Sequence, residues 1–158
     1  MESRAKLLGH PVHQMLIVFP LGLLASAVIF DTIYLLTSHV VMTVVAFWMI
    51  AAGIVGGLVA APFGTIDWMA IPRNTRAKSV GAAHGIGNVI VLILFACSWQ
   101  LRRDMPEAPG VVALVLSYCA GGIALGTAWL GGELVSRLGV GIADNAGPNA
   151  PNSLTKEG

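Results

Sequence analysis

The sequence is poor in charged residues, because Asp, Glu, Lys and Arg make up only 11% of its 158 residues. An average soluble domain is about 25% charged and about 45–50% apolar. This chain is 56% hydrophobic, with a mean hydropathy of +0.78. Such a chain has too few polar groups to cover its apolar surface in water. The composition therefore excludes an ordinary soluble domain and indicates a protein embedded in lipid.

The sequence also lacks the motifs of several enzyme classes. It contains no glycine-rich phosphate-binding loop, no HExxH zinc motif and no nucleophile elbow. A formal net charge of +1, without a separate basic patch, gives no indication of nucleic-acid binding. Its two cysteines, Cys97 and Cys119, lie in apolar stretches without CxxC or zinc-type spacing. We expect both to be small buried residues, and we expect no enzymatic activity of the chain by itself.

Four apolar segments are long enough to cross a bilayer, whose core of about 30 Å requires roughly 20 helical residues. Backbone groups in lipid must be paired within their own segment, so each segment is expected to be an α-helix. The sequence predicts an all-α fold, a transmembrane four-helix bundle over residues 1–138 with a disordered cytoplasmic tail at 139–158. The expected spans are residues 13–36, 40–62, 80–101 and 111–136.

The first span is expected to be retained in the mature protein. Ala25-Ser26-Ala27 has the pattern of a signal-peptide cleavage site, but the apolar run continues through Leu36 and no polar mature sequence follows. Pro20 lies in the middle of this span and removes one backbone hydrogen bond, so a kink is expected there.

Arginine and lysine are unequally distributed between the two sides of this topology. Only Arg102 and Arg103 fall on one side. Seven fall on the other, namely Arg4, Lys6, Arg73, Arg76, Lys78, Arg137 and Lys156. The positive-inside rule then predicts that both termini and the loop over residues 63–79 face the cytoplasm. We expect a multi-pass protein of the inner (plasma) membrane.

Small residues recur at a spacing that allows helices to approach closely in lipid. Three GxxxG patterns are present, at Gly53 and Gly57, at Gly81 and Gly85, and at Gly122 and Gly126. Such faces support packing within a bundle or formation of a homodimer. The sequence does not choose between these two uses.

Ionisable residues at membrane depth are costly and are therefore candidates for function. His10, His13, His84 and Glu133 are all placed at the cytoplasmic end, and Asp67 lies in the adjacent loop. Asp31 and His39 are placed at the outer end, where a hydrogen bond at the rim is the expected role of each.

Each candidate also has a structural interpretation. His10 would cap the first helix, with Pro11 as the first helical residue. His84, which follows Ser79 as the expected N-cap, would form a hydrogen bond between helices. Asp67 would cap a short interfacial helix. Glu133 is expected to pair with Arg137 one turn later.

The chain resembles the predicted membrane family catalogued as domain of unknown function 2231. The resemblance covers most of residues 9–142 and implies a four-helix membrane domain without an established biochemical activity. In the last block the family often has an aromatic residue and a histidine, whereas this chain has Ser136 and Leu138. Some relatives are joined to Rieske-type iron–sulfur domains, so the resemblance implies an association with redox proteins. The matching blocks are Gly9-His10-Pro11-Val12-His13, Phe19-Pro20-Leu21-Gly22, Phe30-Asp31, Gly64-Thr65-Ile66-Asp67-Trp68, Ile71-Pro72, Ala83-His84-Gly85 with Asn88, Gly131-Gly132-Glu133-Leu134-Val135 and Gly139-Val140-Gly141.

Three functions from different classes are compatible with these residues. In the first, the protein is redox-linked and binds one b-type haem between helices 1 and 3, with His13 and His84 as axial ligands. In the second, His10, His13, Asp67 and His84 bind a transition-metal ion (zinc, iron or copper) for sensing or transport. In the third, the chain is a non-catalytic partner subunit in the bilayer. A homodimer or a redox partner is compatible with the first and third.

Overall fold

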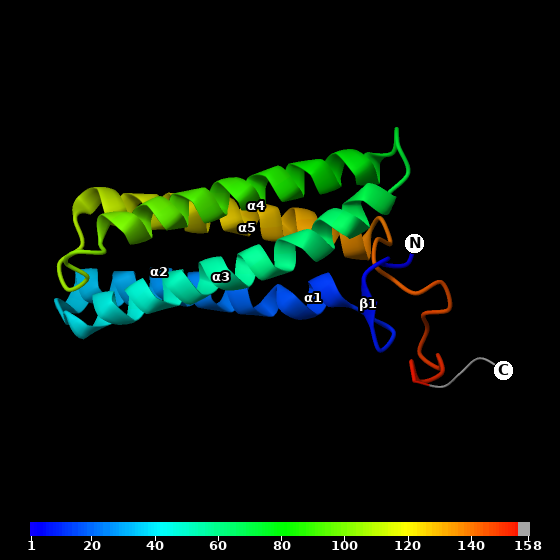
Figure 1. The fold of residues 1–158 in the computed structure, drawn as a ribbon, viewed down its shortest axis with the longest axis horizontal. Coiled ribbons are helices and arrows are strands. Elements are labelled where there is room, and N and C mark those ends of the chain that lie inside the picture. Colours follow the sequence, from blue (N-terminus) through cyan, green and yellow to red (C-terminus); the bar gives the residue numbers. More distant parts are fainter. Residues whose placement is uncertain (155–158) are drawn as a thin grey trace.

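A computed structural model describes residues 1–154 and shows a bundle of four long helices (Figure 1). A short two-stranded hairpin precedes the helices and pairs Lys6 with Pro11 and Leu7 with His10. The elements in chain order are β1 (Lys6–Leu7), β2 (His10–Pro11), α1 (Val12–Leu16), α2 (Val18–Thr37), α3 (Val41–Ala70), α4 (Arg76–Leu101) and α5 (Val111–Ser136).

The helices supply four candidate membrane spans, as the sequence predicts. The first combines α1 and α2 over Val12–Thr37, and α3, α4 and α5 supply one span each, with 26, 30, 26 and 26 residues in order. A helix rises 1.5 Å per residue, so 26 residues extend about 39 Å and exceed the hydrocarbon core of about 30 Å. The all-α class and the four spans are confirmed.

Helix α3 continues beyond residue 62, where the second span was expected to end. The segment over residues 63–79 was expected to be a loop, but α3 runs through Pro62 to Ala70 and α4 already begins at Arg76. The helix ends where Ile71, in an extended conformation, precedes Pro72, because a residue before proline avoids the helical region. Thr75, and not Ser79, is the N-cap of α4, since its side chain accepts a hydrogen bond from the Lys78 amide.

The first span is interrupted at Ile17, between α1 and α2. Pro20 has no N–H, so the carbonyl of Leu16 four residues earlier has no helical partner there. The interruption therefore lies where the proline predicts a kink.

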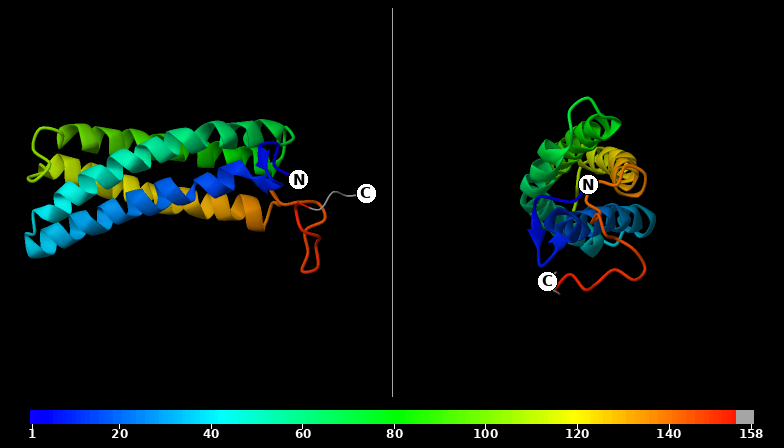
Figure 2. Two further views of the ribbon diagram at one scale, coloured as in Figure 1. Left: turned by 60° about the horizontal axis from the view of Figure 1, so that its bottom comes forward. Right: turned by 90° about the vertical axis from the view of Figure 1, so that its right-hand side faces the viewer.

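The four helices are arranged as two antiparallel hairpins, α2 with α3 and α4 with α5 (Figures 1 and 2). The termini-bearing end of the bundle carries β1, β2, the α3–α4 connection and the C-terminal segment. The far end carries the α2–α3 and α4–α5 connections. A core of apolar residues joins the hairpins and contains Leu24, Ala27, Ala46, Ile50, Val91, Phe95 and Ala120.

The glycine patterns differ in their use. A Cβ atom at Gly53 would lie 2.6 Å from the Leu24 side chain, and one at Gly57 would lie 2.7 Å from Leu92. This pattern packs α3 against both α2 and α4. At Gly122 and Gly126 no atom lies within 4 Å of such a Cβ. The pattern on α5 therefore faces away from the neighbouring helices.

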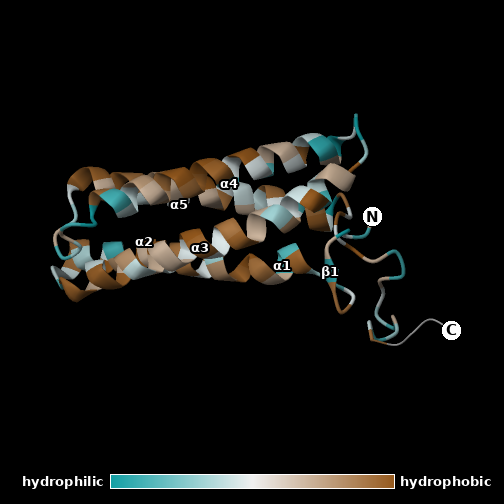
Figure 3. Cartoon of the chain, in the orientation of Figure 1, coloured by the Kyte–Doolittle hydropathy of each residue, from teal (hydrophilic) through white to brown (hydrophobic). Residues whose placement is uncertain are grey.

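Hydrophobic residues run along the helices, and hydrophilic residues gather mainly at the ends of the bundle (Figure 3). Many of the large hydrophobic side chains along the helices are exposed. In the most apolar window of each span only 17–33% of the residues are buried. Cys97 and Cys119 belong to this exposed surface and are free thiols. The expectation that both are buried was wrong, because an apolar stretch in a membrane protein faces lipid as readily as protein.

The N-terminus contacts the segment that follows α5. The Met1 amine donates to the Gly139 carbonyl over 3.0 Å, and the Gly141 amide donates to the Met1 carbonyl over 2.9 Å. Between Arg137 and Leu154 the described chain contains no helix or strand. The last part of the predicted tail, residues 155–158, lies outside the described residues, as does Lys156.

Candidate functional site

His13 lies on α1 and is held against α3. Its Nδ1 is 3.1 Å from the Ala60 carbonyl oxygen. A carbonyl can only accept, so Nδ1 carries the hydrogen and Nε2 is the free nitrogen. Gly64 lies one turn beyond Ala60, and a Cβ there would be 2.7 Å from the His13 ring. Because Gly64 has no side chain, the His13 imidazole can pack against α3.

His84 lies on α4 and is held against α5 in the same way. Its Nδ1 is 2.8 Å from the Thr127 carbonyl oxygen. The ring lies beside Gly131, where a Cβ would be 3.1 Å from the imidazole. Its Nε2 is 3.1 Å from the Asn88 amide nitrogen, so the expected hydrogen bond between helices is present alongside a second contact within α4.

The two histidines therefore belong to different hairpins and share one arrangement. Each directs Nδ1–H to a main-chain carbonyl and a glycine lies beside each ring. A histidine that binds a metal through Nε2 commonly donates its other ring N–H to a carbonyl or carboxylate. Both imidazoles are thus held in the tautomer that leaves the lone pair on Nε2, and at His84 this nitrogen faces the Asn88 amide.

The other two predicted ligands do not join this pair. Asp67 lies on α3 and not in a loop, and its carboxylate accepts from the Ser3 hydroxyl at 2.8 Å and from the Arg4 amide at 2.7 Å. His10 lies in β2 and not at the helix N-cap, which is Pro11. Its Nε2 is 3.3 Å from the Ser153 hydroxyl. Within residues 1–154 no group of three or more His, Cys, Asp or Glu side chains could hold a metal ion.

Glu133 pairs with α4 and not with its own helix. Its carboxylate accepts from the Arg76 guanidinium over 2.6 Å. The predicted partner, Arg137, is the C-cap of α5, where the helical geometry that favours pairs four residues apart ends. This expectation was therefore wrong, and Arg76 at the first turn of α4 provides the contact instead.

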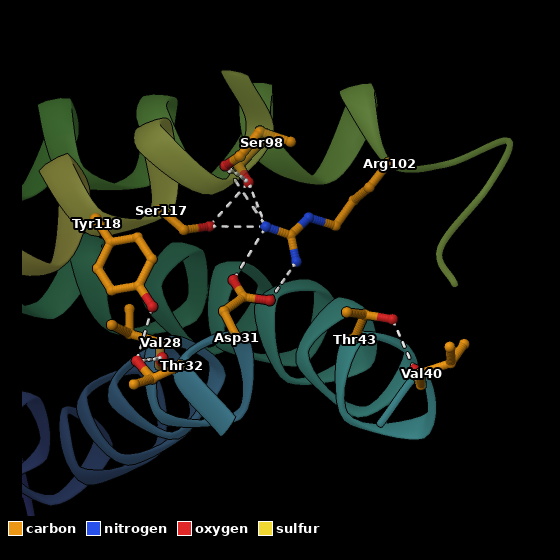
Figure 4. Close-up of polar contacts among 10 residues, drawn as sticks. Val28, Asp31, Thr32, Val40, Thr43, Ser98, Arg102, Ser117 and Tyr118 are labelled. Atoms are coloured by element: carbon orange, nitrogen blue, oxygen red, sulfur yellow. Dashed lines mark hydrogen bonds and ion pairs between the residues drawn. The ribbon is translucent and has the colours of Figure 1, made fainter. Parts of the chain in front are cut away.

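A buried ion pair at the far end of the bundle was not predicted from the sequence. Asp31 and Arg102 have fully buried side chains, and two parallel hydrogen bonds of 2.9 and 3.1 Å join them. The expectation of a rim hydrogen bond for Asp31 was wrong. Figure 4 shows the Arg102 guanidinium pointing between Asp31 and the hydroxyls of Ser98 and Ser117, each 3.1 Å away.

One sequence signal could have identified this pair. Ser98 precedes Arg102 by four residues, which places both on one face of α4. Asp31 is the single acidic residue in an otherwise apolar segment. An unpaired carboxylate in lipid is costly, so a cation at the same end of the bundle was the partner to seek.

The fold defines an integral membrane protein, a four-helix bundle whose described residues include the buried ion pair of Asp31 and Arg102. A family model described as "Predicted membrane protein (DUF2231)" matches residues 9–144, and the chain belongs to this family. No curated protein and no solved structure matches the chain.

Proposed function

We propose that the protein is a membrane redox protein that binds one b-type haem between α1 and α4, with His13 and His84 as the axial ligands. One observation carries the proposal. The two imidazoles lie on different hairpins, and each has its Nδ1–H directed to a main-chain carbonyl, Ala60 or Thr127. This arrangement favours the tautomer in which Nε2 carries the lone pair that would bind iron, although at His84 the Asn88 amide would first have to leave this nitrogen.

The donor set fits haem better than it fits a hydrated metal ion. Two neutral imidazoles on two helices are a common axial ligand pair of membrane cytochromes. Gly64 and Gly131 make room for the imidazoles themselves, because a Cβ there would lie 2.7 Å and 3.1 Å from the respective ring. When bound, haem supplies one-electron chemistry, while the protein supplies binding, orientation and a low-dielectric setting.

The four-ligand metal hypothesis receives less support. Asp67 is occupied by donors from the N-terminal segment, and His10 lies beside Ser153. A metal ion at this site would therefore have two protein ligands. A structural zinc ion generally has four, and a catalytic zinc ion has three.

Haem reconstitution separates these functions. The purified protein, without a histidine tag, is titrated with haem in detergent and followed by absorption. His13→Ala and His84→Ala are expected to lose the spectrum of the bound haem, whereas His39→Ala, at the far end, keeps it. Wild-type protein that stays colourless in excess haem contradicts the proposal. Stability lost in His84→Ala without any bound species would instead support a non-catalytic partner subunit.

We infer further that both termini face the cytoplasm and that the chain lies in the inner (plasma) membrane. The unequal Arg and Lys distribution supports this, with Arg73, Arg76 and Lys78 near the α3–α4 connection. A redox partner or a second copy would then meet the haem from the cytoplasmic side. Reporter fusions after Leu138 and within residues 103–109 test the orientation. A periplasmic signal from the first fusion would contradict it.

A further inference from the structure

Asn88 contacts both the ring and the backbone of His84. It lies one helical turn after His84 on α4, and its amide nitrogen is 2.9 Å from the His84 carbonyl oxygen and 3.1 Å from His84 Nε2. The carbonyl is an acceptor only, so the amide nitrogen must face it and donate. The second amide hydrogen is then available for Nε2.

Thr127 completes this arrangement from α5. Its hydroxyl donates to the Asn88 Oδ1 over 3.0 Å, while its carbonyl accepts from His84 Nδ1 over 2.8 Å. The amide orientation is therefore fixed by the His84 carbonyl at its nitrogen, and the Thr127 hydroxyl, which also lies 3.0 Å from the Ala124 carbonyl, contacts its oxygen. Both ring nitrogens of His84 are in use, and the imidazole is held neutral with its hydrogen on Nδ1.

His13 has no equivalent of this contact. Its Nδ1 bonds to the Ala60 carbonyl, and in the part of the chain that the structure describes its Nε2 has no hydrogen-bond partner. The two histidines of the site are therefore unequal. His13 presents a lone pair that is ready for a ligand, whereas the lone pair of His84 is covered by a side-chain amide.

We propose that Asn88 is a gating residue, whose amide must leave Nε2 before His84 can bind an incoming group. This inference rests on the proposed haem site. A ligand binds first through His13 and engages His84 only when the Asn88 side chain rotates about χ1 or χ2. The hydrogen bond thereby lowers the affinity of the site for every ligand that binds both rings, and it disfavours ligands that cannot compensate for its loss.

The first test measures the hydrogen bond from the Asn88 amide to His84 Nε2 in the absence of any ligand. Nitrogen NMR of histidine-labelled protein in micelles reports whether Nε2 of His84 accepts a hydrogen bond. We expect the Nε2 resonance to move in Asn88→Leu, which keeps the side-chain volume. It should stay in Thr37→Val, because the Thr37 hydroxyl lies at the far end and donates to the Ile33 carbonyl. An Nε2 resonance that is the same in wild type and Asn88→Leu overturns the proposal.

The second test measures access to the ring. Haem affinity in Asn88→Leu is expected to rise about fivefold, the factor that corresponds to one typical protein hydrogen bond. Equal haem affinity in wild type and Asn88→Leu would contradict the proposal that Asn88 controls access to His84.

A separate readout distinguishes failure of the gate from failure of the haem proposal. If neither protein binds haem, the proposed function is wrong, and the gate is judged by the rate at which diethyl pyrocarbonate modifies His84, resolved by peptide mass spectrometry. Faster modification of His84 in Asn88→Leu, with His39 unchanged, supports control of access by Asn88. Equal rates for His84 overturn it.

Discussion

Asp31 on α2 and Arg102 at the end of α4 form a bidentate ion pair that is fully buried in the apolar bundle. It joins the two hairpins at the far end, and the hydroxyl of Ser117 extends it to α5. Ser98 contributes a further hydroxyl from α4 and donates its own hydrogen to the Ala113 carbonyl over 2.7 Å. The relative position of the hairpins at this end is therefore fixed by polar contacts.

Removal of one partner leaves the other charge buried without compensation. We expect Arg102→Met or Asp31→Leu to destabilise the protein by about 3–5 kcal/mol, and the double variant to be far less affected than either single variant. Unfolding by denaturant in detergent measures this cycle. The control is Arg103→Met at the exposed neighbouring position, with an expected change within about 0.5 kcal/mol. Single variants as stable as wild type would contradict the buried pair.

The N-terminal segment is held by Asp67. The carboxylate accepts from the Ser3 hydroxyl and from the amides of Arg4 and Ala5. Loss of hydrogen bonds to a charged group should raise the opening of this segment about tenfold or more. We expect Asp67→Ala to accelerate trypsin cleavage after Arg4 and Lys6 in micelles by that factor. Asp104→Ala, at the far end, serves as the control, and an unchanged rate in Asp67→Ala would show that the segment is held by other contacts.

Gly64 is expected to be essential for the position of His13. A methyl group there would lie 2.7 Å from the imidazole, so Gly64→Ala must displace the ring. The overpacking is expected to cost about 1–3 kcal/mol and to weaken haem binding. Gly122→Ala is the matched control, because no atom lies within 4 Å and helix propensity favours alanine by about 1 kcal/mol. Equal effects of the two substitutions would mean that the His13 ring does not pack against α3 at Gly64.

The Arg76–Glu133 pair should contribute little, in contrast to Asp31–Arg102. The Arg76 side chain is 61% exposed, and exposed ion pairs are worth about 0.2–1 kcal/mol. Glu133→Gln is expected to lower the free energy of unfolding by less than about 1 kcal/mol. Arg137→Gln is expected to have no measurable effect, because Arg137 does not take part. A larger loss of unfolding free energy in Arg137→Gln than in Glu133→Gln would indicate that Glu133 pairs with Arg137 within α5.

The sequence alone predicts the spans because hydropathy is a local property. Segment length and the absence of charge define each helix without knowledge of its neighbours. The ends of the helices are less predictable, since Pro62 lies inside α3 and is tolerated in an apolar setting. The expected span ends at residue 62, whereas α3 continues to Ala70.

Pairing between distant residues depends on how the hairpins pack, and one sequence does not show this. His13 and His84 are identified by their cost at membrane depth, but Asp67 binds the N-terminal backbone and Glu133 binds Arg76. Arg102 was counted as a loop residue because it follows the last apolar residue of α4. Its burial depends on Asp31, which lies 71 positions earlier.

The most direct test of the account is the electron paramagnetic resonance spectrum of the haem-loaded protein, because it reports the axial ligands of the iron. Two imidazole ligands should give a low-spin ferric signal at one haem per chain in wild type. Loss of one ligand, in His13→Ala or in His84→Ala, should convert it to a high-spin signal, and His39→Ala should leave it unchanged. A low-spin signal that survives both substitutions, or a wild-type protein that binds no haem, would contradict the central claim.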